Sequence, residues 1–175
     1  MKRTAFTLIE LLVVISIIGL LSTVAVVATT SARLSARNTK RKADMVQISK
    51  ALELYYNDNG GYPSTGGQWY GVCSGAGNFV VKTDSGAGGW IPNLAPAYIG
   101  ILPRDPNSGK INPTSANATC RTDPTYTCLI YNSNGTDYDL LAHCTPEGTM
   151  LATDPFYDAG RPTWAWTIHS ANGNF

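Results

Sequence analysis

A continuous apolar run from Phe6 to Ala28 dominates the first part of the chain. Its length of roughly 23 residues matches the ~20 residues that a helix needs to cross a bilayer. One carboxylate, Glu10, lies near its start, and an acid at the centre of a membrane helix costs on the order of 2.5 to 3.5 kcal/mol. The run therefore predicts a membrane helix over residues 6–28 in which Glu10 has a particular role.

The helical pattern continues over residues 29–57 as an amphipathic segment. One apolar stripe, at steps close to 3.6 residues, is formed by Leu34, Met45, Ile48, Leu52 and Tyr55. Because Asn38 and Arg41 occupy the same stripe, we expect the first turns to be polar all round and the packing face to begin near Met45. Asn59-Gly60-Gly61 then predicts the end of the helix.

The strongest strand pattern lies late in the chain, in Tyr126–Asn132 and Asp137–Cys144 on either side of Asn134-Gly135. Asn-Gly between two apolar-rich runs favours a hairpin with a two-residue loop. Alternating apolar positions over residues 164–168 predict a last strand. We therefore expect an α+β fold, in which a long N-terminal helix packs on a small antiparallel β-sheet head, residues 58–175.

A two-residue loop would also set the register of this hairpin. Tyr131 would lie opposite Tyr138, and Leu129 opposite Leu140, on an apolar face that packs on the helix. The reverse face, which we expect to be more exposed, carries Cys128, Asp137, Asp139 and His143.

Charge divides the chain into two parts, although its net charge is only +1. Lys2–Tyr56 carries eight basic residues against three acidic ones, about +5, and Asn57–Phe175 carries five against nine, about −4. A nucleic-acid-binding domain is basic overall or on one face, so nucleic acid is not an expected partner. A basic group follows the apolar run and predicts either a membrane-facing collar or a docking surface for an acidic neighbour: Arg33, Arg37, Lys40, Arg41 and Lys42.

All four cysteines lie beyond the apolar run, at Cys73, Cys120, Cys128 and Cys144. In a loop-rich head they predict two disulfides and an oxidising compartment. Three pairings are open; we favour Cys120 with Cys128 and Cys73 with Cys144. Zinc ligation by three of these cysteines and His143 is disfavoured, because the spacings match no common structural site.

Catalytic patterns are weak in the head. His143 and Asp139 could belong to a hydrolytic triad, but the sequence has no G-x-S-x-G motif and no activated-cysteine context. We therefore predict that the chain is not an enzyme, and we expect no cofactor. Several aromatic residues suggest the alternative of a head that stacks on sugars, a host surface or DNA, although core packing explains most of them: Trp69, Tyr70, Trp90, Trp164 and Trp166.

The residues Lys2-Arg3-Thr4-Ala5, followed by Phe6–Val14 with the sequence FTLIELLVV, resemble the class III signal of type IV pilins and type II secretion pseudopilins. The resemblance implies that a prepilin peptidase removes the leader, residues 1–5, by cutting between Ala5 and Phe6, and that it methylates the new amine of Phe6. The family usually has Gly before the cut, and Ala5 departs from that pattern, which lowers the expected efficiency of processing.

Parts of the head are similar to landmarks of the major pseudopilin, namely Gly60–Pro63, Leu102–Pro106 and Tyr138–Leu141. Major pseudopilins bind calcium in a late loop, where this chain has Asp154 and Asp158. The acidic pattern of the family is not reproduced here, so these two residues are weak calcium candidates and a solvated turn is the preferred interpretation.

Glu10 then becomes a candidate assembly residue. A carboxylate in hydrocarbon needs a partner or a proton, and the amine that cleavage creates at Phe6 of a neighbouring subunit is such a partner. The alternative is that Glu10 extends to the cytoplasmic interface.

The expected orientation of the chain in the membrane follows from the leader rather than from the number of basic residues on each side of the apolar run. The basic residues between Arg33 and Lys42 would by count place the head in the cytoplasm. The leader implies a cytoplasmic N-terminus, and the cysteines favour an oxidising compartment. We therefore expect a single pass through the inner or cytoplasmic membrane with the head outside, followed by transfer to an extracellular or periplasmic filament.

The resulting expectation is a structural subunit of a type IV pilus-like filament. Its implied partners are identical or related pilin subunits, which form a helical polymer, prepilin peptidase, and an inner-membrane assembly platform. The alternatives are a type II secretion major pseudopilin, or a minor pilin whose head is an adhesion or DNA-binding module.

Overall fold

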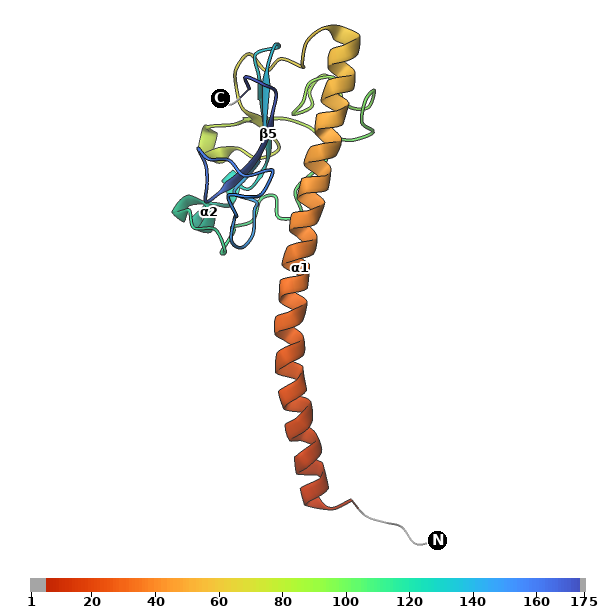
Figure 1. Cartoon of the computed structure of the whole chain (residues 1–175), viewed down its shortest axis with the longest axis vertical. Helices are drawn as coiled ribbons and strands as arrows, with labels where there is room; N and C mark the ends of the chain where they lie inside the picture. The colour runs from red at the N-terminus through yellow and green to blue at the C-terminus, as the bar shows by residue number, and fades with distance from the viewer. Residues whose placement is uncertain (1–5, 174–175) are drawn as a thin grey trace. The chain divides into compact units, whose positions relative to one another are not determined.

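The computed structural model describes residues 6–173 and divides the chain into two compact units, Met1–Ala36 and Arg37–Phe175. The N-terminal unit contains the first part of one long helix, α1 (Leu8–Asn59), which continues into the second unit (Figure 1). Lys2, Arg3 and Ala5 lie outside the described residues. The observed α+β fold confirms the predicted class.

Helix α1 ends where the glycines predict. Gly60 has a φ of +74°, which glycine adopts without steric cost, and its N–H donates to the carbonyl of Tyr56 at 2.7 Å. This bond satisfies a carbonyl of the last turn that would otherwise lack a partner.

The second unit holds a sheet of five strands in the order β2-β1-β3-β4-β5. Strands β1 and β2 are parallel and the other neighbours are antiparallel. The strands are β1 (Tyr70–Gly71), β2 (Val80–Val81), β3 (Cys128–Ser133), β4 (Tyr138–His143) and β5 (Ala165–His169). A short helix, α2 (Ala118–Thr122), and two 3-10 turns, Gly75–Gly77 and Pro124–Tyr126, lie in the connections. The predicted last strand is confirmed as β5.

The hairpin register differs from the prediction by two residues. Ser133 pairs with Tyr138, and Tyr131 with Leu140, so the loop comprises residues 134–137 rather than two residues. Since the shift is even, the paired side chains of β3 and β4 keep the faces that were predicted for them.

The loop is longer because of the conformation of Asn134. A type I′ turn needs positive φ at both central residues, and here Gly135 has it (φ +96°) while Asn134 does not. The Oδ1 of Asn134 instead accepts hydrogen bonds from the N–H groups of Thr136 and Asp137, at 2.9 and 2.8 Å. This side-chain turn spans four residues.

One face of the sheet packs on the second part of α1, as predicted. Met45, Ile48 and Leu52 are each 0% exposed and share a core with the inward face of β3 and β4. Burying an aliphatic side chain of this size contributes roughly 1.5 to 3 kcal/mol. The apolar stripe of the helix therefore supplies the main contact between α1 and the sheet.

The reverse face of β3 and β4 is also buried, which contradicts the expectation that it is exposed. Cys128 and Asp139 are both fully buried, and Ile130 and Leu141 form a second core there. The connecting segments cover this face with the partly buried side chains of Trp69, Val72 and Phe79.

Asp139 is held in this second layer by polar contacts. Its Oδ1 accepts a hydrogen bond from the hydroxyl of Thr167 at 2.6 Å, and its Oδ2 lies 3.6 Å from the guanidinium of Arg161. Burial raises the pKa of Asp139 to about 6, against the smaller lowering effects of Thr167 and Arg161.

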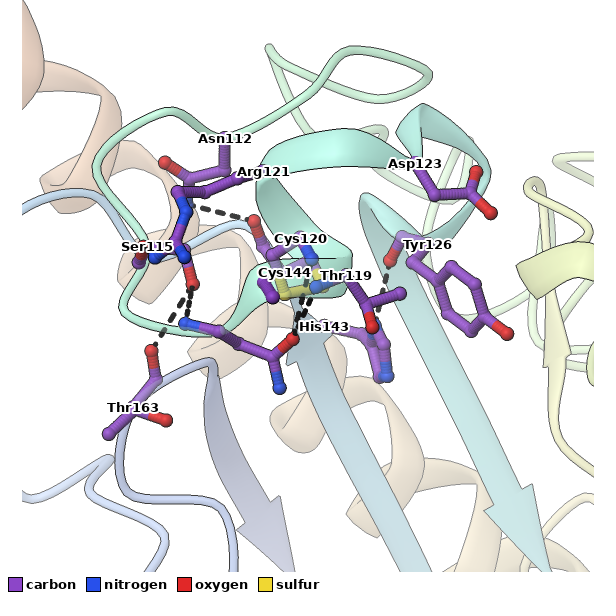
Figure 2. Close-up of a disulfide and its surroundings, with 12 residues drawn as sticks. Asn112, Ser115, Thr119, Cys120, Arg121, Asp123, Tyr126, His143, Cys144 and Thr163 are labelled. Atoms are coloured by element: carbon purple, nitrogen blue, oxygen red, sulfur yellow. Dashed lines mark hydrogen bonds between the residues drawn. A yellow bond between two sulfur atoms is a disulfide. The ribbon is translucent and has the colours of Figure 1, made fainter.

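The disulfides join Cys73 to Cys128 and Cys120 to Cys144, so the pairing favoured from the sequence is wrong. Cys144 follows β4 with a φ of +57°, so it does not continue the alternation of side chains along the strand. Its side chain meets Cys120 of α2 instead (Figure 2). These bonds also exclude the zinc site that would have used three of the cysteines.

Candidate functional site

The start of α1 contains a reciprocal capping arrangement between Thr7 and Glu10. The backbone N–H and the hydroxyl of Thr7 donate to Oε2 of Glu10 at 2.9 and 2.6 Å, and the N–H of Glu10 donates to the hydroxyl of Thr7 at 3.3 Å. A Thr-x-x-Glu sequence at a helix start makes these bonds because the first N–H groups have no partner within the helix. Glu10 therefore has a local partner that the sequence analysis did not identify.

The side chains that follow Glu10 are apolar and exposed. Ile15, Ile18 and Leu21 are 59%, 56% and 63% exposed, for example, and the polar Ser16 and Ser22 donate to carbonyls of their own helix. Of the described residues, α1 alone is long and apolar enough to span a membrane, and an 18-residue stretch of it has a mean hydropathy of 2.8. Such a surface needs lipid or other apolar helices around it.

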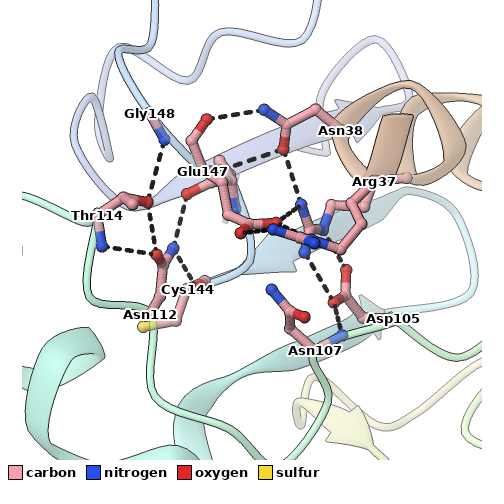
Figure 3. A network of polar contacts seen from close by, with 11 residues as sticks. Arg37, Asn38, Asp105, Asn107, Asn112, Thr114, Cys144, Glu147 and Gly148 are labelled. Atoms are coloured by element: carbon pink, nitrogen blue, oxygen red, sulfur yellow. Dashed lines mark hydrogen bonds and ion pairs between the residues drawn. The ribbon is translucent and has the colours of Figure 1, made fainter. Parts of the chain in front are cut away.

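A buried ionic cluster joins α1 to the head about one turn before Met45 (Figure 3). Nε of Arg41 lies 2.6 Å from Oδ2 of Asp105, and its Nη1 lies 2.8 Å from Oε2 of Glu147. The Arg41 and Asp105 side chains are 0% exposed. Arg37 adds two bonds to Glu147, at 2.6 and 2.7 Å, and Asn38 exchanges two hydrogen bonds with the backbone of Glu147.

Two expectations are corrected by this cluster. The packing face of α1 begins at Arg41, a full turn before Met45, because a buried charge can take part in packing when carboxylates surround it. A membrane-facing collar is wrong for Arg37, Arg41 and Lys42, since each pairs with a carboxylate of the head. The acidic neighbour is the chain's own head.

The cluster keeps Glu147 ionised. Burial raises the pKa of Glu147, but hydrogen bonds and charges from Arg37 and Arg41 outweigh it and hold that pKa below its usual value. The bonds to Glu147 in turn raise the pKa of Arg37. Sequence reasoning missed Asp105 and Glu147, although an arginine on an apolar stripe is itself a signal that a buried acid lies opposite.

The calcium candidates are both bound to cationic side chains. Asp154 pairs with Lys42, whose ammonium group lies 4.5 Å from the centroid of the Trp166 ring. Asp158 pairs with Arg161 at 2.7 Å and accepts the N–H of Gly160 at 2.8 Å. Among the described residues, no group of three His, Cys, Asp or Glu side chains could hold a metal ion. Both aspartates have structural contacts instead.

His143 and Asp139, the two residues that could belong to a hydrolytic triad, are not bonded to each other. Nδ1 of His143 bonds to the carbonyl of Tyr126 at 2.7 Å, whereas Asp139 bonds to Thr167. His143 lies among aromatic rings, 5.0 Å from Phe79 and 4.7 Å from Trp164 between centroids. Burial lowers the pKa of His143 to about 4, despite the opposing hydrogen bond to Tyr126.

His143 should make the head sensitive to acid. Its folded pKa of about 4 lies below the ordinary 6.5, so its contribution to stability is complete above pH 6.5 and is lost as the pH falls towards 4. His143→Phe removes this titration. Between pH 7 and pH 4, the free energy of unfolding of wild type should therefore fall by about 3 kcal/mol more than that of the variant. Urea unfolding at both pH values measures this difference, and a constant difference would contradict the prediction.

Comparisons with known proteins give two findings. Residues 1–26 match the family model of the prokaryotic N-terminal methylation motif. Over 64 residues, 37% of the chain, the sequence is 41% identical to the type II secretion system core protein G of Pseudomonas aeruginosa, 39% identical to that of Escherichia coli and 38% identical to that of Vibrio cholerae.

These matches cover only part of each protein. The aligned stretch spans 44 to 45% of the length of those three relatives, and no solved structure matches the chain significantly. The chain thus carries the prepilin-type methylation motif and is homologous to type II secretion core protein G, which confirms its resemblance to type IV pilins and pseudopilins.

Proposed function

We propose that the chain is a structural subunit of a type IV pilus-like filament, processed between Ala5 and Phe6 and assembled through its N-terminal helix. The methylation motif over residues 1–26 carries the proposal. It is supported by the first part of α1, whose apolar side chains are exposed in the single chain and need a membrane or other helices to cover them.

Membrane insertion comes before assembly in this proposal. The N-terminus faces the cytoplasm, where a prepilin peptidase cuts and methylates, and the head lies outside, where its two disulfides can form. An inner-membrane platform then moves the subunit into a filament of identical or related subunits, in the periplasm or outside the cell.

Glu10 directs the transfer from lipid to filament. Both Thr7 donors bind its Oε2, and the N–H of Thr7 lies after the proposed cut, so this arrangement survives processing. The other carboxylate oxygen makes no hydrogen bond within the described residues. The cationic amine of Phe6 in a neighbouring subunit supplies a partner for it, and pairing of the two charges favours the filament over the isolated subunit in lipid.

Substitution of Glu10 tests the proposal. Glu10→Leu should abolish filaments and Glu10→Gln should reduce them strongly, because leucine offers the amine no partner and glutamine offers it only an uncharged carbonyl oxygen. Ser16→Ala is the matched control in the same apolar run, where the Ser16 hydroxyl bonds only to carbonyls of its own helix, and it should assemble like wild type.

The measurement is the amount of subunit in sheared filaments, with mass spectrometry of Phe6 to confirm cleavage and methylation in each variant. Wild-type filament yield from a processed Glu10→Leu chain would overturn the role of Glu10. An uncleaved wild-type chain would overturn the proposed function itself.

A second candidate is the major pseudopilin of a type II secretion system. The identity to core protein G over 64 residues favours it. Loss of secreted enzymes from the culture medium on deletion of the gene would distinguish this role from that of a surface pilus.

A further inference from the structure

A hollow of about 170 Å³ opens on the head beside the Cys120–Cys144 disulfide. Asn117 and Thr119, at the start of α2, line one side of it, and Tyr126, His143 and Trp164 also line it. Figure 2 shows His143, Tyr126 and Thr119 gathered near the disulfide. The hollow belongs entirely to the second unit and plays no part in the proposed assembly of the filament.

Aromatic rings form the walls of this hollow. The rings of Tyr126 and His143 are stacked, with centroids 5.7 Å apart and an angle of 26° between their planes. Trp164 meets His143 edge to face at 4.7 Å. The hydroxyl of Tyr126 accepts a hydrogen bond from Nδ2 of Asn78 at 2.7 Å, which fixes the ring. The walls are therefore preorganised, and both Tyr126 and Trp164 remain partly exposed.

Polar atoms at the edges of the hollow are left for a ligand. Oδ1 of Asn117 accepts from the N–H groups of Thr119 and Cys120 at the start of α2, so its amide N–H₂ remains a donor. Nδ1 of His143 binds a carbonyl, so its Nε2 is an acceptor. The Thr119 hydroxyl can serve as either. Within the described residues, none of these three groups has a hydrogen-bond partner for the atom named.

The side chains that line the hollow carry no net charge at physiological pH. None of its lining residues is acidic or basic apart from His143, and burial keeps the pKa of that histidine near 4, so it is neutral at physiological pH. Such a surface offers no counter-charge for a phosphate or a carboxylate, and no anionic ligand set for a metal cation.

We propose that this hollow binds a neutral pyranose ring of a glycan. The aromatic walls suit the apolar C–H face of a sugar, and the Asn117 amide, the Thr119 hydroxyl and Nε2 of His143 suit its ring of hydroxyls, which both donate and accept. The volume is well below the roughly 300 to 1,000 Å³ of sites for drug-sized ligands. A single sugar unit is therefore the part of the glycan that enters.

Saturation-transfer NMR on the full chain tests this inference. The protein is held in micelles of a zwitterionic detergent, because maltoside and glucoside detergents carry the proposed ligand as a headgroup. The probes are the methyl glycosides of glucose, galactose, mannose and N-acetylglucosamine, with glucuronic acid as the charged comparison. At least one neutral glycoside should receive saturation, and glucuronic acid should receive much less.

Two variants and one matched control locate the site. Thr119→Arg fills the hollow and should abolish the transfer. Thr122→Arg is its matched control, three residues further on the same exposed helix and outside the hollow, and should leave the transfer unchanged. Asn117→Asp keeps a side chain that caps a helix equally well but replaces the amide donor by a carboxylate. It should weaken binding about tenfold.

The inference is overturned if no neutral glycoside receives saturation from the folded wild-type chain. It is also overturned if Thr119→Arg and Thr122→Arg behave alike, or if glucuronic acid binds as well as the neutral sugars. Each result is independent of whether the chain forms filaments, because the measurement uses the unassembled protein.

Discussion

Arg41→Met is expected to lower the free energy of unfolding of the head by about 3 to 5 kcal/mol. The substitution removes the only cation within bonding distance of Asp105 among the described residues, and the Asp105 side chain is 0% exposed. Glu147 loses one of its two arginines but keeps Arg37. Most of the loss therefore comes from leaving the Asp105 carboxylate buried without a counter-charge.

The measurement is urea unfolding of the full chain in detergent, followed by tryptophan fluorescence, since all four tryptophans lie beyond residue 57. Lys40→Met is the matched control on the neighbouring position, where Lys40 makes an exposed pair with Asp44 one turn away. Lys40→Met should lower the free energy of unfolding by no more than about 0.5 kcal/mol. The loss in free energy of unfolding for Arg41→Lys should lie between those for Arg41→Met and Lys40→Met. An ammonium group cannot bond both carboxylates in the geometry of the guanidinium. Equal losses for Arg41→Met and Lys40→Met would show that the buried cluster does not stabilise the head.

Removal of the Cys73–Cys128 disulfide is expected to cost about 4 kcal/mol. The bond closes a loop with a sequence separation of 55 residues, whereas Cys120–Cys144 closes one of 24. A cross-link restricts the unfolded chain more when its loop is longer, and the chain-entropy relation gives about 4.2 kcal/mol for the first bond and about 3.4 kcal/mol for the second. Cys73 and Cys128 also belong to the second core with Ile130 and Leu141.

The paired variants Cys73→Ala/Cys128→Ala and Cys120→Ala/Cys144→Ala compare the two bonds by the same unfolding measurement. Alanine keeps the buried positions apolar, so the comparison reports the cross-link more than the side chain. The first pair should be the less stable, and peptide mapping of the wild-type chain should recover the two bonded pairs. A mapped Cys73–Cys144 bond, or a loss below about 1 kcal/mol in both variants, would contradict the expectation.

The face of the sheet on which each residue of β3 and β4 lies was easier to predict than the pairing register of the two strands. Alternation along β3 and β4 assigned Tyr131, Tyr138 and Leu140 to the face that packs on α1, and they are buried there. The loop length was wrong because it depended on the φ angle of one asparagine, and the exposure of the reverse face was wrong because distant segments cover it. Periodicity shows which side chains share a face but contains no information about what covers that face.

Features that depend on neighbours along the chain could be predicted from the sequence. These are the methylation motif at residues 1–26, the apolar helix with its early Glu10, the helix end at the glycines and the β-hairpin. The apolar helix, its end and the β-hairpin arise from hydrogen bonds or hydrophobic periodicity within a few residues, and the motif is itself a short stretch of sequence, so the local sequence is enough to predict them.

Contacts between distant residues could not be predicted from local patterns and follow from the folded head. Arg41 finds its carboxylates 64 and 106 residues away, and the disulfides and the hollow beside His143 join segments from separate parts of the head. A basic residue beyond an apolar run has the same local sequence whether it faces lipid or a buried acid. Packing of the whole head selects between these environments, because a buried charge is stable only where the fold supplies its partner.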